Sequence, residues 1–70
     1  MNIIAKMASP GVWDLYCNGH LAATVTRVHR ERKDAYVLEG KGWSQEVKSV
    51  AAGCGRVGAM LREVARRGVP

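Results

Sequence analysis

Apolar and polar positions follow two different periods along this chain. Between residues 11 and 47, short runs of alternating apolar and polar residues are separated by turn residues, which is typical of antiparallel strands. Between residues 49 and 67, apolar residues recur at steps of four and three, which predicts an amphipathic helix. The expected apolar stripe consists of Val50, Cys54, Val57, Leu61 and Val64. Ser49 fits the N-cap of this helix, and Gly68 followed by Pro70 would end it.

The Asn18-Gly19 pair predicts a tight connection between two strands, because such turns need a positive φ. A two-residue turn would pair Cys17 with His20 and would leave the apolar residues of the second strand on the wrong side of the sheet. A three-residue loop with Gly19 in a bulge instead pairs Tyr16 with His20, and we expect this arrangement. Its apolar face would consist of Trp13, Leu15, Leu21, Ala23 and Val25. Its other face would consist of Asp14, Tyr16, His20, Ala22, Thr24 and Thr26.

A dense run of charges, "RVHRERKD", continues the second strand, and we expect residues 27–33 to form the tip of another hairpin. Residues 35–40, "AYVLEG", are rich in β-branched and aromatic residues and favour a strand. A turn at residues 40–42 follows, and residues 43–47 alternate in a way that indicates a further strand. A helix that begins at Ser44 is the alternative for this last segment.

These elements predict an α+β fold in a single domain, residues 1–70. We expect an antiparallel sheet of three to four strands from the hairpins of residues 11–47, with one C-terminal helix, residues 49–67, packed on one face. Residues 1–10 are ambiguous, because their apolar positions fit a helical turn as well as a short strand. The hairpin register and the helical stripe together select a core of Trp13, Leu15, Val25, Leu61 and Val64.

The chain length limits the functions that the domain can support. A protein of 70 residues buries only about 60% of the surface of its unfolded chain, so we expect no pocket for a cofactor. Eleven Lys and Arg against six Asp and Glu give a formal net charge of +5, which favours polyanionic or acidic partners. The chain lacks an apolar run that resembles a signal peptide or a membrane span, so we expect a cytoplasmic protein without membrane contact.

The densest positive charge lies around the expected 27–33 hairpin. The candidate nucleic-acid-binding residues are Arg27, His29, Arg30, Arg32 and Lys33. A two-stranded ribbon of this kind can enter a DNA major groove or follow phosphates. The competing interpretation is a solvated loop whose charges keep a sheet edge from aggregating.

A second cluster consists of Arg62, Arg66 and Arg67. We expect this cluster to form a solvent-exposed helical face, in which Glu63 neutralises part of the charge.

One face of the expected sheet has no helix to cover it. The candidate partner-binding residues on this face are Tyr16, Thr24 and Thr26, and the face would meet water, a second copy of the chain or a protein partner.

An antiparallel sheet followed by one helix resembles the arm-type DNA-binding domains of tyrosine recombinases in architecture, which implies DNA binding, although no motif of that family is present. We therefore expect a small nucleic-acid-binding or regulatory accessory protein. The alternative is a protein-protein interaction module, an inhibitor or a homodimer, that uses the open face.

Three glycines near the start of the helix have the G-x-G-x-x-G spacing of a dinucleotide site, at Gly53, Gly55 and Gly58. Such a site also needs a second strand after the helix, and only residues 68–70 follow it here, so we expect a structural role instead. Gly58 would allow the helix to approach the sheet closely. Gly53 and Gly55 would lie in a loosened first turn, and a helix that begins nearer Arg56 is the alternative.

Cys17 and His20 have the C-x-x-H spacing of half a zinc site, which Cys54 or His29 could complete. The sequence contains no second close-spaced pair of ligands, so we expect both cysteines to be metal-free thiols with packing roles. A Cys-His nucleophile pair would need an orienting group and an oxyanion site, and a hairpin tip offers little to exclude water. We therefore expect no catalytic residues and no enzyme.

Overall fold

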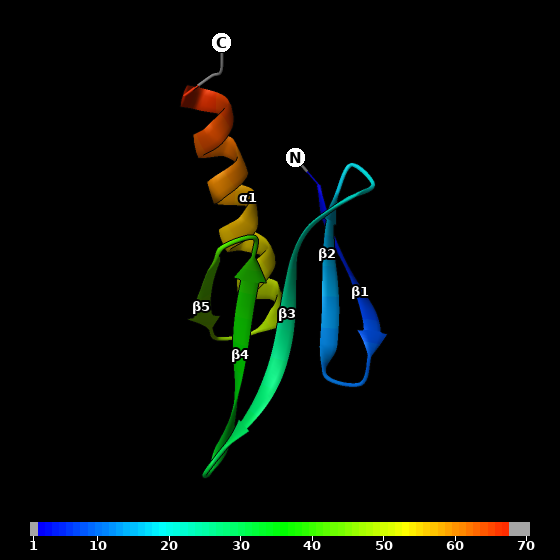
Figure 1. Cartoon of the computed structure of the whole chain (residues 1–70), viewed down its shortest axis with the longest axis vertical. Helices are drawn as coiled ribbons and strands as arrows, with labels where there is room; N and C mark the ends of the chain where they lie inside the picture. The colour runs from blue at the N-terminus through cyan, green and yellow to red at the C-terminus, as the bar shows by residue number, and fades with distance from the viewer. Residues whose placement is uncertain (1, 68–70) are drawn as a thin grey trace.

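The computed structural model describes residues 2–67, except for the side chain of Arg67. Five strands and one helix make up this part of the chain (Figure 1): β1 (Ile3–Ser9), β2 (Val12–Cys17), β3 (His20–Arg30), β4 (Lys33–Gly40), β5 (Trp43–Val47) and α1 (Val50–Arg67). The strands form one antiparallel sheet in the order β1-β2-β3-β4-β5, and α1 packs on one face of it. The expected α+β fold with one C-terminal helix is confirmed, but the sheet has five strands instead of three to four.

Two ambiguous segments account for the difference in strand number. Residues 3–9 form β1, which pairs with β2, and Ile3 packs against the core. Residues 43–47 form β5, which pairs with β4, so Ser44 lies in a strand and the alternative of a helix that begins there is wrong. Within residues 2–67, no helix is long and apolar enough to cross a membrane.

The β2–β3 hairpin differs in register from the sequence expectation. Cys17 pairs with His20 across a two-residue turn, and the expected pairing of Tyr16 with His20 is wrong. Asn18 has a φ of 52° and Gly19 a φ of 82°, so both central residues adopt the left-handed conformation that tight hairpin turns favour. Asparagine tolerates this conformation better than most residues with a side chain, which explains why the shorter turn forms.

A bulge within β3 restores the apolar register that the two-residue turn alone would lose. Ala22 is the extra residue, because Leu21 pairs with Tyr16 while Ala23 pairs with Leu15. Ala23 is therefore buried on the same face as Leu15, which confirms its expected place on the apolar face. Its cross-strand partner is Leu15, and the partner that the expected register gave it, Trp13, pairs with Val25 instead. Leu21 points to the opposite face and is 59% exposed, so its expected place on the apolar face is wrong.

The core lies between the sheet and α1. The buried residues that pack together are Leu15, Ala23, Val25, Leu38 and Val57. Trp13 and Leu61 are partly buried against this cluster, whereas Val64 is 64% exposed and is wrongly placed in the expected core. The last turns of α1 extend past the sheet (Figure 1), and Val64 borders an open depression between α1 and the β2–β3 turn, so it stays accessible to water.

Residues at the start of α1 form a regular, capped helix. The backbone nitrogen of Ala52 donates to Ser49 Oγ at 3.0 Å, which confirms the expected N-cap. The backbone nitrogen of Gly53 donates to the Ser49 carbonyl oxygen at 3.0 Å, so the expected loosened first turn is wrong. The expected ends of the helix at Gly68 and Pro70 lie outside the described residues.

The close approach of helix and sheet is at Gly53 instead of Gly58. A Cβ at Gly58 would lie 3.9 Å from Ile3 Cγ1, which is an ordinary contact. A Cβ at Gly53 would lie 3.0 Å from Val25 Cγ2, tighter than side chains normally pack. A Cβ at Gly55 would meet nothing within 4 Å. The glycine at position 53 thus lets the first turns of α1 sit directly on β3.

Candidate nucleic-acid interface

The β3–β4 hairpin projects beyond its neighbours in the sheet (Figure 1). Strand β2 pairs with β3 only as far as Thr26, and β5 pairs with β4 only as far as Tyr36. Residues 28–35 therefore form a two-stranded segment with neither β2 nor β5 paired beside it, which we call the ribbon. Its tip is the turn at residues 31 and 32, inside the hairpin expected at residues 27–33.

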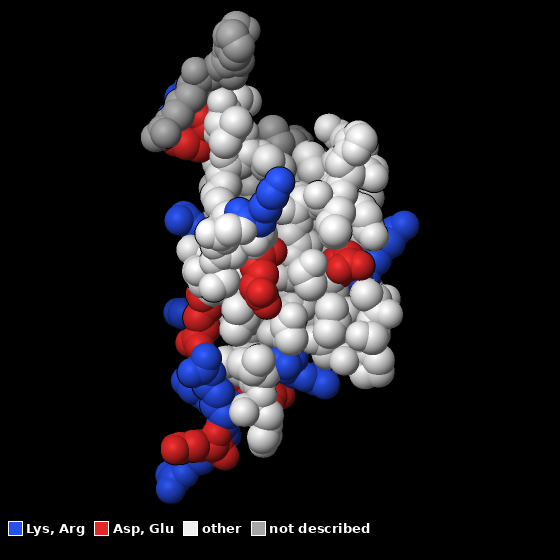
Figure 2. Space-filling view, in the orientation of Figure 1, with Lys and Arg blue, Asp and Glu red and all other residues white. Residues whose placement is uncertain are grey.

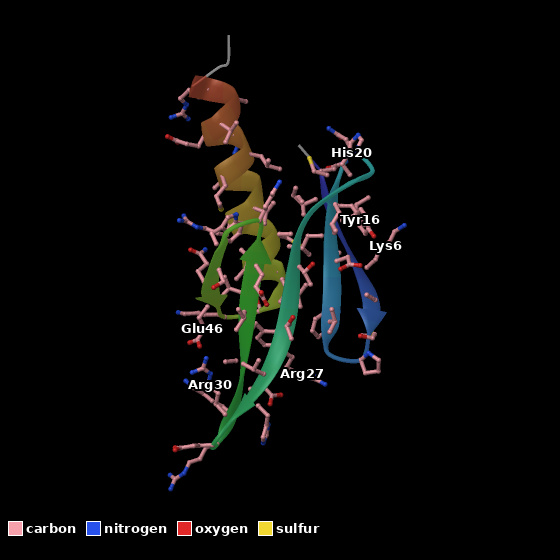
Figure 3. All side chains as sticks on the ribbon, viewed as in Figure 1. Lys6, Tyr16, His20, Arg27, Arg30 and Glu46 are labelled. Carbon is pink, nitrogen blue, oxygen red and sulfur yellow. The ribbon has the colours of Figure 1, made fainter. Side chains whose placement is uncertain are left out.

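The strand period distributes the basic side chains over both faces of the ribbon. Arg27 and His29 continue the side of β3 that carries the buried Val25, so they lie on the helix side. Arg30 and its cross-strand partner Lys33 lie on the opposite, uncovered side. Figure 3 shows Arg27 and Arg30 projecting in opposite directions from the hairpin. The structure therefore brings the five candidate residues to one end of the molecule without gathering them on one face.

Two acidic residues partly neutralise this cluster, and neither contact was expected from the sequence. His29 Nδ1 lies 2.8 Å from Asp34 Oδ1, its partner in the strand register. Arg30 Nη2 lies 3.3 Å from Glu46 Oε2, which β5 supplies (Figure 3). All four side chains are substantially exposed, and such pairs contribute only about 0–1 kcal/mol. A phosphate could therefore replace either acid at little cost.

The other three cations are unpaired in the described part of the chain, where Arg27, Arg32 and Lys33 form no ion pair. Arg27 lies at the base of the ribbon, where its backbone nitrogen donates to the Gly11 carbonyl oxygen at 2.7 Å. Its side chain crosses the β1–β2 turn, with Cβ, Nε and Nη2 each 3.9 Å from the position that a Cβ on Gly11 would take. Gly11 also has a φ of 81°, a conformation that disfavours residues with a side chain. A glycine at this position therefore leaves space for the side chain of Arg27.

The uncovered face of the sheet carries the other predicted residues, Tyr16, Thr24 and Thr26. Cross-strand pairing puts one polar row across all five strands, formed by Lys6, Asp14, Thr24, Glu39 and Ser44. Within it, Thr24 Oγ1 donates to Asp14 Oδ1 at 3.3 Å. Figure 2 shows separate acidic and basic groups on this face, while Lys, Arg, Asp and Glu gather around the projecting hairpin. The sheet face is therefore not a basic surface.

Tyr16 lies in a second, more apolar row on the same face. It pairs with Ile4 on one side and with Leu21 on the other, and these two neighbours are 55% and 59% exposed. The ammonium nitrogen of Lys6 lies 5.7 Å from the centre of the Tyr16 ring. Lys6 thus occupies part of the ring surface on which a nucleobase would stack.

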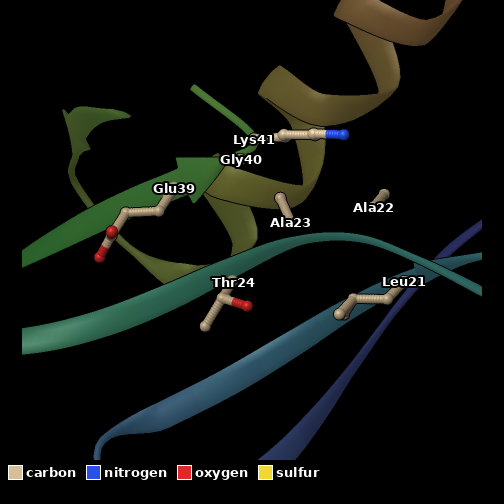
Figure 4. Close-up of a pocket in the computed structure, with 7 residues that line it drawn as sticks. All are labelled: Leu21, Ala22, Ala23, Thr24, Glu39, Gly40 and Lys41. Carbon is tan, nitrogen blue, oxygen red and sulfur yellow. The ribbon is translucent and has the colours of Figure 1, made fainter. Parts of the chain in front are cut away.

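A shallow depression opens where the β3–β4 pairing ends (Figure 4). Pairing begins at Thr24 with Glu39, so residues 21–23 have no β4 partner. The lining residues are Leu21, Ala22, Ala23, Thr24, Glu39, Gly40 and Lys41. Glu39 and Lys41 are the charged groups among them, and no described Cys or His lines the depression, so it offers no nucleophile-base pair.

The two cysteines are free thiols, and both are partly buried. Burial raises the pKa of the Cys54 thiol above its ordinary value, and a backbone hydrogen bond offsets only part of this effect. A raised pKa lowers the thiolate fraction, which is the form that attacks substrates and binds metals. Among the described residues, no three His, Cys, Asp or Glu side chains are grouped closely enough to hold a metal ion.

Comparisons with family models, curated proteins and solved structures give no match to this chain. The architectural resemblance to recombinase arm-binding domains is therefore not extended to any residue. Of the surfaces described, only the ribbon combines a projecting shape with a concentration of cations.

Proposed function

We propose that this is a small cytoplasmic nucleic-acid-binding protein, with a regulatory or accessory role, that contacts phosphates through the ribbon and its base. The observation that carries the proposal is the shape of the β3–β4 hairpin, which stands clear of β2 and β5. Arg27, Arg30, Arg32 and Lys33 are distributed around it and are accessible to a polyanion from more than one side. His29 lies among them and is held by Asp34.

The charge balance of the ribbon sets the expected strength of binding. Arg27, Arg32 and Lys33 can contact phosphates directly, and Arg30 can do so if it leaves Glu46. Contact with about 3–4 phosphates corresponds to a slope of roughly −3 in log K against log salt concentration on duplex DNA. So few contacts support only weak binding at physiological salt, which fits an accessory role more closely than that of an autonomous repressor.

Salt titration of binding to a duplex DNA tests the proposal. The double variant Arg30→Ala, Arg32→Ala should reduce the magnitude of the slope by close to two units. The matched control Arg62→Ala, Arg66→Ala removes the same charge from the exposed part of α1 and should change the slope much less. Circular dichroism establishes that both variants keep the fold. Absence of binding by the wild type at low salt, or a larger effect of the helix pair, would show that the ribbon is not the interface.

A second candidate function is self-association through the apolar row Ile4, Tyr16 and Leu21. The supporting observation is that Ile4 and Leu21 flank Tyr16 on a sheet face that none of the described elements covers, and each is more than half exposed. A second copy supplies the same row, so the contact can be self-complementary. Sedimentation equilibrium should then show a dimer that Leu21→Ser dissociates, whereas Met7→Ser, at a similarly exposed residue on the other face of the sheet, leaves it intact. A wild type that stays monomeric at high concentration excludes this function.

A further inference from the structure

We infer that the ribbon enters the major groove of duplex DNA, with Arg27 directed to one wall of phosphates and Arg30 and Lys33 to the other. This inference rests on the proposed nucleic-acid function and narrows it to B-form DNA. Its basis is the combination of the ribbon's length, its thickness and the placement of its cations on two faces.

The length of the unsupported segment matches the depth of the groove. The last β3 residue held from the β2 side is Arg27, through its bond to Gly11 in the β1–β2 turn, and β3 continues to Arg30. Three residues at about 3.4 Å each extend the ribbon by roughly 10 Å, and the tip turn adds to this. The major groove of B-DNA is about 8.5 Å deep and about 12 Å wide, and a sheet with its side chains is about 10 Å thick. The ribbon therefore fits the groove tip first.

The cation placement matches a groove better than a flat surface. With the ribbon inserted tip first, Arg27 on its helix side and Arg30 with Lys33 on its uncovered side face opposite groove walls. A flat polyanionic surface would engage only one of these sets at a time. Glu31 and Arg32 at the tip then lie nearest to the base edges. In this arrangement Arg32 contacts a base in place of a phosphate, so the double variant Arg30→Ala, Arg32→Ala reduces the magnitude of the salt slope by about one unit instead of two. Arginine is the side chain that most often reads guanine in this groove.

Other nucleic acids fit the ribbon less well. The major groove of A-form RNA is too deep and narrow for side chains to read. Single strands are held mainly by stacking of bases on aromatic side chains, and residues 28–35 contain none besides the ring of His29. The nearest tyrosine on this hairpin, Tyr36, contacts Trp13 at a ring separation of 6.0 Å and is partly buried against the core.

The test compares three 20-base-pair probes of one sequence by fluorescence anisotropy at a single low salt concentration. The first is unmodified DNA, the second is DNA whose cytosines carry a glucosylated hydroxymethyl group at C5, and the third is RNA. The C5 substituent fills the major groove without altering the phosphate charge. We expect the affinity for the second and third probes to be at least about tenfold below that for the first. The variant Arg32→Ala should narrow this difference, and Arg62→Ala should not.

The outcomes separate this inference from the proposed function. Equal binding to modified and unmodified DNA would mean that the ribbon follows phosphates outside the groove. Equal or tighter binding to the RNA duplex would likewise overturn the groove assignment. In both cases nucleic-acid binding itself stands. If none of the three probes binds, the proposed function and the groove inference both fail.

Discussion

Gly53 and Gly55 lie two residues apart in α1, and only Gly53 faces the sheet. A Cβ at position 53 would lie 3.0 Å from Val25 Cγ2 and 3.7 Å from both Leu38 Cδ1 and Val47 Cγ2. A Cβ at position 55 would meet nothing within 4 Å, and this residue is exposed. The variants Gly53→Ala and Gly55→Ala therefore add the same methyl group to the same helix, one against the core and one into water.

Both substitutions increase the helix propensity, but only Gly53→Ala adds a steric clash with the core. Replacing glycine with alanine inside a helix stabilises it by about 1 kcal/mol, and this gain applies at both positions. At position 53 the methyl group must displace Val25, a fully buried side chain with little rotamer freedom, and overpacking of this kind costs about 1–3 kcal/mol. Gly55→Ala should thus raise the free energy of unfolding by about 1 kcal/mol, whereas Gly53→Ala should leave it unchanged or lower it by up to about 2 kcal/mol.

Urea unfolding followed by circular dichroism measures both variants. Their free energies of unfolding should differ by about 1–3 kcal/mol, and a difference of 1 kcal/mol corresponds to about 4–8 °C in Tm for a domain of this size. The difference between the variants isolates the contact with Val25, because the helix propensity cancels. If both variants are stabilised equally, α1 does not press on β3 at Gly53 and the account of this close approach is wrong.

Three further predictions concern the core, the helix cap and the charge of the ribbon. Leu38→Ala should lower the free energy of unfolding by about 2–5 kcal/mol, whereas Val64→Ala should change it by less than about 0.5 kcal/mol in the same urea titration. Ser49→Ala should cost about 1 kcal/mol because the amide of α1 that it caps loses its acceptor, and Ser49→Asp should retain the stability. Glu46→Gln removes the carboxylate that pairs with Arg30 and leaves this arginine free to contact a phosphate. The salt slope of DNA binding should therefore become steeper by up to about one unit. Glu39→Gln, which removes the same charge from an acid outside the ion pairs described, should steepen it less, and equal effects would contradict a specific role of the pair.

The positions of the turns could be predicted from the residues, but the pairing across one of them could not. Asn18 and Gly19 indicate a tight turn, and both adopt a positive φ. Two arrangements bring Leu15 and Ala23 to the same face: a three-residue loop, or a two-residue turn followed by an extra residue in the strand. The alternation of apolar and polar residues shows that one extra residue lies between Leu15 and Ala23. It does not show whether this residue belongs to the turn or to the strand. The bulge at Ala22 therefore could not be predicted from the apolar pattern.

Two other errors have a common physical origin, because they depend on which elements meet in space. Val64 lies on the same helical stripe as Val57, yet only Val57 is buried, since the gap between α1 and the β2–β3 turn stays open at Val64. The sequence likewise shows the positive charge around Arg30 but not its proximity to Glu46, which lies on a different strand. Periodicity describes one element at a time, and contacts between elements depend on the lengths of their partners.

The meander order of the strands affects how the molecule assembles. Every strand pairs with its neighbour in sequence, so the sheet can form from local contacts, which favours rapid folding. The helix is the exception, because α1 packs across the sheet as far as β1, near Ile3. During synthesis the strands can therefore pair while their apolar face is still open to water, and this face is covered only after the helix has emerged from the ribosome. Until then Leu15, Val25 and Leu38 form an exposed apolar surface, and the nascent chain passes through a stage in which it can associate with other hydrophobic surfaces.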